Sequence, residues 1–94
     1  MKPAASEIRR KQLHFRAIHR GCKEADAILG AFAALHLPEL DEQELEMFAA
    51  LLEVPDPELY DWLRGAAAVP SLHDTPVFAR LKAICERKHP TWSA

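Results

Sequence analysis

The 94-residue sequence contains little glycine, and this scarcity excludes several classes of nucleotide-binding enzyme. Its three glycines, at positions 21, 30 and 65, form neither a phosphate-binding loop nor a dinucleotide-binding fingerprint. None of its serines lies in a nucleophile elbow, because each falls at a helix start or near a chain end. We therefore expect no enzymatic activity and no stably bound cofactor.

Cysteine is equally scarce. The two thiols, Cys22 and Cys85, are too few for the disulfide framework of a small secreted protein, and we expect them to be reduced. No CxxC or HExxH pattern is present, and the pair His19 and Cys22 straddles a predicted helix break. The sequence therefore predicts no metal site.

Long apolar runs are absent as well. No stretch approaches the length of a membrane span, and the first ten residues lack the apolar core of a secretory signal. The helical pattern also begins too early for a transit peptide to precede it. We therefore expect a bacterial cytoplasmic protein that is not inserted into a membrane and whose mature domain starts near Met1.

No stretch alternates with a period of two or is dense in β-branched residues, so we predict an all-α fold. The expected architecture is a single domain over residues 1–94, a small five-helix bundle with an ordered core of about 6–89 and a flexible tail at 90–94. The five predicted helices cover 6–19, 22–36, Asp41 to the stop at Val54-Pro55, Asp56 to Gly65, and Asp74 or Thr75 to His89.

Apolar residues at spacings of three and four predict the core face of each helix. In the first helix these residues are Ile8, Phe15 and Ile18. In the second they are Ala25, Ile28, Leu29, Phe32 and Leu35. Asp41 and Glu44 have the spacing of a capping box, and Asp56 followed by Pro57 predicts an N-cap and a proline at the first helical position.

The charges of the two signs are separated along the chain. Residues 2–23 include seven basic side chains and a single acid, Glu7, whereas residues 24–61 contain no Lys or Arg. This asymmetry suits oriented docking on a protein better than binding to a uniform polyanion. The net charge of -2 and the lack of aromatics between the basic residues predict no nucleic-acid partner. The alternative, a small nucleic-acid binder, would show strongly salt-dependent binding.

The segment from Arg16 to Asp26 joins the first two helices and concentrates charged side chains around Gly21. In a purely structural interpretation Gly21 ends one helix, while Arg20 and Glu24 complement the dipoles of the two helix ends. In a functional interpretation the glycine lets a partner's backbone approach, and Arg20 and Glu24 flank it as donor and acceptor. Composition alone leaves both interpretations open.

The residues Arg20-Gly21-Cys22-Lys23-Glu24 match the RGxxE motif of the FAD assembly factors of succinate dehydrogenase, the SdhE family or "flavinators". A second block, Phe48 to Leu63, resembles the family's Leu-Leu-Glu…Asp-Pro…Leu…Trp segment. The resemblance extends from about Arg9 to Gly65, and beyond Ala66 it is faint.

This resemblance implies a helical protein that binds the flavoprotein subunit of succinate dehydrogenase, and of fumarate reductase where present, and promotes covalent attachment of FAD. It also implies that Arg20, Gly21 and Glu24 contact the partner and that Asp26 and Arg16 support them. Because members of the family have carried an antitoxin label (CptB), the alternative is a regulatory protein that binds a toxin-like partner. The identity of the partner distinguishes the two.

Overall fold

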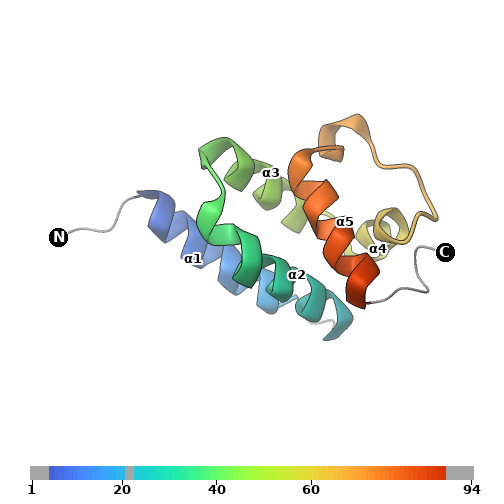
Figure 1. Cartoon of the computed structure of the whole chain (residues 1–94), viewed down its shortest axis with the longest axis horizontal. Coiled ribbons are helices and arrows are strands. Elements are labelled where there is room, and N and C mark those ends of the chain that lie inside the picture. Colours follow the sequence, from blue (N-terminus) through green and yellow to red (C-terminus); the bar gives the residue numbers. More distant parts are fainter. Residues whose placement is uncertain (1–4, 21–22, 89–94) are drawn as a thin grey trace.

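The computed structural model describes residues 5–20 and 23–88, which form helices joined by short connections (Figure 1). The five α-helices are α1 (Ala5–Ile18), α2 (Lys23–His36), α3 (Glu42–Leu52), α4 (Asp56–Leu63) and α5 (Pro76–Lys88). Two short 3-10 helices, η1 (Leu37–Glu39) and η2 (Ser71–His73), precede α3 and α5. The described ranges contain no strand, so the predicted all-α, five-helix fold is confirmed. The predicted tail at 90–94 lies outside them.

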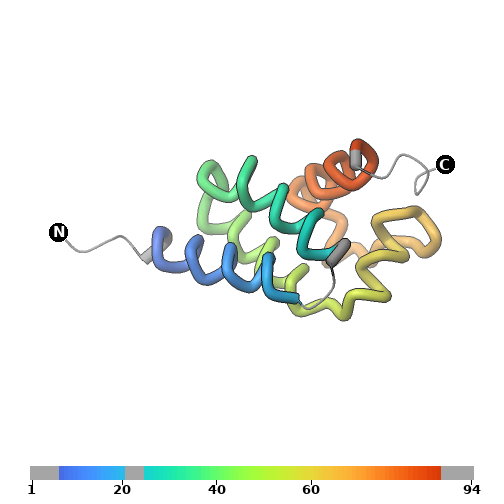
Figure 2. The backbone as a smooth tube through the Cα atoms, turned by 90° about the horizontal axis from the view of Figure 1, so that it is seen from below, coloured from blue at the N-terminus to red at the C-terminus, as the bar shows by residue number. Residues whose placement is uncertain are grey.

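The helices form two layers. α1 and α2 lie side by side and antiparallel and form one layer. α3 and α5 form the second layer, which packs against the first (Figure 1). α4 packs against α5 at the end of the bundle where α1 ends (Figure 2). The end of α1 and the connection between α3 and α4 are therefore neighbours, although more than thirty residues separate them in the sequence.

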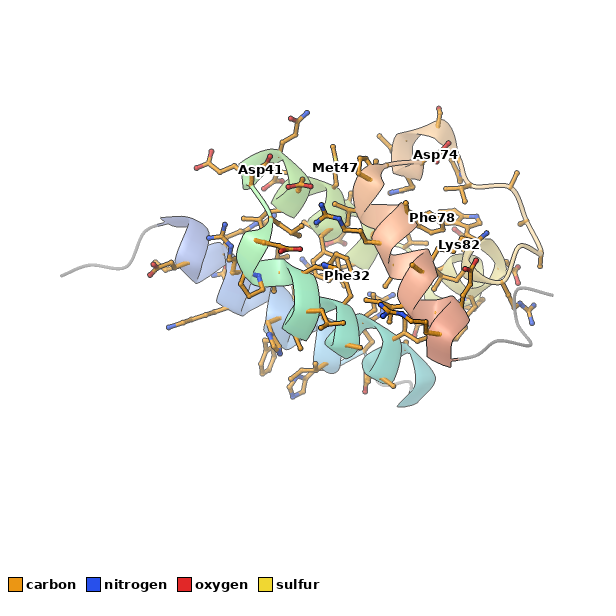
Figure 3. All side chains as sticks on the ribbon, viewed as in Figure 1. Phe32, Asp41, Met47, Asp74, Phe78 and Lys82 are labelled. Carbon is orange, nitrogen blue, oxygen red and sulfur yellow. The ribbon has the colours of Figure 1, made fainter. Side chains whose placement is uncertain are left out.

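The core between the layers is apolar. Phe32 of α2 and Phe48 of α3 are the largest fully buried side chains, and their ring centroids lie 4.8 Å apart. Figure 3 shows Phe32 in the middle of the molecule, between α2 and the layer of α3 and α5. No polar or charged side chain is buried within the described ranges.

The predicted core face of α1 is wrong. Ile8, Phe15 and Ile18 are 47%, 62% and 39% exposed, whereas Leu13 and Ala17 are completely buried. Arginines lie on the same side of the helix as Leu13 and Ala17 and form ion pairs and hydrogen bonds with α3, η1 and residues near them. Leu13 and Ala17 fill the core between the stems of these arginines, and the aromatic and aliphatic residues opposite face outward.

The predicted core face of α2 is correct except at its end. Ala25, Ile28, Leu29 and Phe32 are buried, but Leu35 is 58% exposed. In both Figure 1 and Figure 2, α5 crosses α2 nearer its N-terminal half, so α5 does not cover the last turn that contains Leu35.

The structure confirms some of the predicted helix caps and contradicts one. The capping box of α3 is confirmed: the Glu44 backbone N donates to Asp41 Oδ1 at 2.8 Å, and the Asp41 backbone N donates to Glu44 Oε1 at 3.1 Å. Thr75 rather than Asp74 caps α5, because its Oγ1 accepts from the Phe78 backbone N at 3.2 Å. The prediction that Asp56 is the N-cap of α4 is wrong, since Pro55 occupies that position and Asp56 is the first helical residue.

Cys85 is a buried thiol, and burial raises its pKa, with a smaller contribution from the nearby Glu86 carboxylate. A raised folded-state pKa means that the unfolded chain loses this proton first as the pH rises. The thiol's contribution to stability is therefore complete below about pH 8.5, the ordinary pKa of cysteine, and is lost at higher pH.

In a Cys22→Ser variant we expect Cys85 to react with a thiol reagent only at the rate of unfolding. Rapid labelling of the native protein would contradict this.

Candidate partner-binding site

Arg20 follows α1, and its side chain lies against the connection between α3 and α4. Its Nε donates to Asp56 Oδ1, its Nη1 to the Leu52 carbonyl and its Nη2 to the Val54 carbonyl, each at 2.7 Å. Nη2 also lies 2.6 Å from Asp56 Oδ1. The Arg20 side chain is only 11% exposed. We call Arg20, Leu52, Val54 and Asp56 the Arg20 cluster.

The helix ends explain why a cation binds here. The last carbonyl groups of an α-helix have no partner within the helix and lie at the negative end of its dipole. Leu52 is the last residue of α3 and Val54 follows it closely, so their carbonyls attract a guanidinium. Asp56 lies in the first turn of α4, at the positive end of that helix's dipole, where a carboxylate is favoured. One arginine thus joins two helix ends through charge-assisted hydrogen bonds.

Asp26 holds the same residue from the other side. The Arg20 backbone N donates to Asp26 Oδ1 at 2.9 Å, and Asp26 is partly buried in the first turns of α2. The main chain of Arg20 is therefore bonded to α2, while its side chain is bonded to the connection between α3 and α4. Both contacts fix the end of α1 relative to the rest of the bundle.

Arg16 forms a weaker connection on the same side. Its Nη2 is hydrogen bonded and ion paired with Glu53 Oε1, but the two side chains are 40% and 72% exposed. Arg9 pairs with Glu46 at 3.3 Å, and both of these side chains are also exposed. Exposed pairs of this kind contribute little to stability. They show that part of the charge asymmetry seen along the sequence is neutralised within the molecule.

The structure brings together three of the five predicted site residues, Arg16, Arg20 and Asp26. Gly21 lies outside the described residues, as does the side chain of Glu24. Asp56 was not expected in this group, because its place before Pro57 in the sequence suggested a helix cap. The carbonyls of Leu52 and Val54 could not be predicted as acceptors from the sequence, because every residue has a backbone carbonyl.

Apolar side chains are exposed close to this end of α1. Phe15 stacks on His19 with ring centroids 4.0 Å apart, and His19 Nδ1 donates to the Phe15 carbonyl oxygen at 2.8 Å. Phe15 and Ile18 also line an open groove of about 460 Å³ between α1 and α2, together with Ala33 and Leu37. Exposed apolar residues gathered in this way are typical of contact surfaces.

Within 5–20 and 23–88 no three His, Cys, Asp or Glu side chains lie together as they would around a metal ion. None of the helices in that part of the chain has the length and apolar character needed to cross a membrane.

The fold and site define a small all-α protein in which one arginine joins two inter-helical connections. A family model described as "Flavinator of succinate dehydrogenase" matches residues 11–85, and the chain belongs to this family. The suspected resemblance is thereby confirmed. The match includes the RGxxE motif and the whole Arg20 cluster.

Individual relatives agree with this membership. The chain is 41% identical over 73 residues to the FAD assembly factor SdhE of Acetobacter pasteurianus, covering 78% of this chain and 67% of that protein. It is 38% identical over 68 residues to the FAD assembly factor SdhE of Coxiella burnetii, covering 72% and 74%. It is 35% identical over 77 residues to the mitochondrial succinate dehydrogenase assembly factor 2 of Dictyostelium discoideum, covering 82% and 55%.

The matched part of this chain thus spans between about half and three quarters of the length of these relatives. No solved structure matches the chain. The family is one of assembly factors and not of enzymes, in agreement with the sequence prediction.

Proposed function

We propose that this protein assembles succinate dehydrogenase by binding its flavoprotein subunit and promoting the covalent attachment of FAD to that subunit. The observation that supports this most directly is the family match over residues 11–85, together with relatives named as FAD assembly factors. The proposal places the protein in the bacterial cytoplasm and includes the flavoprotein subunit of fumarate reductase as a second client.

In this proposal the bond-forming chemistry belongs to the client. A histidine nitrogen of the flavoprotein subunit would bond to the 8α carbon of the isoalloxazine ring, and the two hydrogens lost from the nitrogen and the carbon would reduce the ring itself. The assembly factor would hold no FAD of its own. A protein that binds one conformer of its client better than another shifts the population towards that conformer. The factor would accelerate attachment by favouring the conformer in which the histidine and the flavin are aligned.

The surface that we propose for client binding surrounds the connection between α1 and α2. Gly21 and Glu24 would contact the client directly, and Arg16, Arg20 and Asp26 would support them. The exposed side chains of Phe15 and Ile18 support this location, because they add apolar area beside the charged groups. Charged groups favour correct orientation, and apolar area favours affinity.

In-gel flavin fluorescence of the denatured flavoprotein subunit tests the proposal, because only covalently attached FAD survives denaturation. Deleting the gene should remove the fluorescent band, and the wild-type chain should restore it. Gly21→Arg should fail to restore it while keeping a nearly normal helical circular dichroism spectrum. Ala67→Arg, which places the same side chain on an exposed loop after α4, should restore the band. An unchanged band after deletion would refute the assembly role.

A further inference from the structure

Resting on the proposed function, we propose that Asp56 is a positioning residue for client binding, acting through Arg20. Asp56 lies in α4, distant in the sequence from the RGxxE motif. Its Oδ1 accepts a hydrogen bond from Arg20 Nε at 2.7 Å and forms an ion pair with Nη2 at 2.6 Å. The motif's arginine thus orients the end of α1 and is not itself a main contact of the client.

The burial of the guanidinium supports this assignment. With 11% of its side chain exposed and with three acceptor groups already bonded, Arg20 has little surface left for a partner. An arginine that binds a partner directly presents its planar fork of donors to that partner. Here the fork faces the Leu52 and Val54 carbonyls and the Asp56 carboxylate within the same chain.

Arg20 in turn positions the end of α1. Its backbone N is bonded to Asp26 of α2, so this residue is held by one carboxylate through its main chain and by another through its side chain. Without Asp56 the guanidinium keeps only neutral carbonyl acceptors, which form weaker hydrogen bonds than a carboxylate does. The end of α1 would then occupy its binding orientation for a smaller fraction of the time, which lowers the apparent affinity by that fraction.

Titration calorimetry tests this proposal by measuring the affinity of the full chain for the flavoprotein subunit that lacks covalent FAD. Asp56→Asn should weaken binding about tenfold or more, at a temperature where urea titrations show the variant to be fully folded. Asp56→Glu, which retains the charge, should recover part of the loss. Asp61→Asn is the matched control, because Asp61 is also in α4 but pairs with Arg64 on the exposed surface at 2.9 Å.

A double-mutant cycle with Arg20→Gln separates positioning from direct contact. If Asp56 acts through Arg20, the double variant should bind no more weakly than Arg20→Gln alone, because coupled residues are not additive. The NMR signal of Arg20 Nε–H should keep its position when the client binds, and it should shift in free Asp56→Asn.

Two results would overturn the inference while leaving the proposed function intact. One is wild-type affinity in Asp56→Asn. The other is a double variant whose loss of affinity equals the product of the two single-variant losses, together with a large shift of the Arg20 Nε–H signal on client binding. If the wild-type chain itself failed to bind the flavoprotein subunit, the proposed function would be refuted, and this inference with it.

Discussion

Replacing Phe32 with alanine should lower the free energy of unfolding by about 3–5 kcal/mol. The side chain is completely buried and lies between the two layers, against Phe48. Removing it takes away apolar contacts from both layers and leaves a cavity that the packed helices fill only in part. Since domains of this size have a total stability of roughly 5–15 kcal/mol, this one change removes a large share of it.

Urea unfolding followed by circular dichroism gives the measurement, and Phe15→Ala provides its matched control. Phe15 is 62% exposed, so the same truncation there should cost less than about 1 kcal/mol, mostly from the lost stacking on His19. Comparing the unfolding free energies of the two variants also tests the structure against the sequence pattern, which placed Phe15 in the core. Equal losses for the two variants would contradict the outward orientation of Phe15.

The helices themselves were predictable because local signals determine where they begin and end. Proline residues, the Asp41–Glu44 capping box and Gly65 mark the boundaries near which α2, α3 and α4 begin or end. Gly65 adopts a positive φ of 75°, the left-handed conformation that glycine tolerates at a helix end. Signals of this kind depend on a few neighbouring residues, so they can be read without knowledge of the tertiary fold.

The orientation of α1 was not predictable in the same way. Apolar periodicity favours a face containing Phe15 and Ile18, but the buried face contains Leu13 and Ala17 between arginines. Arginine has a long apolar stem and can cover a core while its charged end forms hydrogen bonds at the edge. Arg10 does this with the carbonyls of Leu37 and Leu40, at 3.2 and 2.5 Å. Such bonds depend on which helix packs opposite, and periodicity contains no information about that.

The group of residues around Arg20 was only partly predictable from the sequence. Arg20 and Asp26 were expected there because they belong to one short charged segment. Asp56 was not, because its partner lies 36 residues away and its local context explained it as a cap. A residue with a sufficient local explanation gives no reason to search for a distant partner. For this reason the group that bonds the motif's arginine most strongly emerged only from the structure.

Replacing Arg20 with alanine should lower the free energy of unfolding by about 2–4 kcal/mol, the second-largest effect that we expect. Removing one member of a largely buried ion pair leaves the other without compensation. Here the change leaves the Asp56 carboxylate, 24% exposed, and the carbonyls of Leu52 and Val54 without their donor. Water reaches Asp56 in part, so the loss should be somewhat smaller than at a fully buried pair.

Arg16→Ala is the control for this prediction, because it deletes an arginine of the same helix end whose partner Glu53 is 72% exposed. That variant should lose less than about 1 kcal/mol, the usual range for surface pairs. Urea midpoints compared at low and high salt add a second distinction. Screening should remove most of the Arg16 effect and little of the Arg20 effect, because the Arg20 cluster is shielded from solvent ions. Similar losses for both variants, equally sensitive to salt, would show that Arg20 is no more than a surface charge and would remove the physical basis for assigning Asp56 a positioning role.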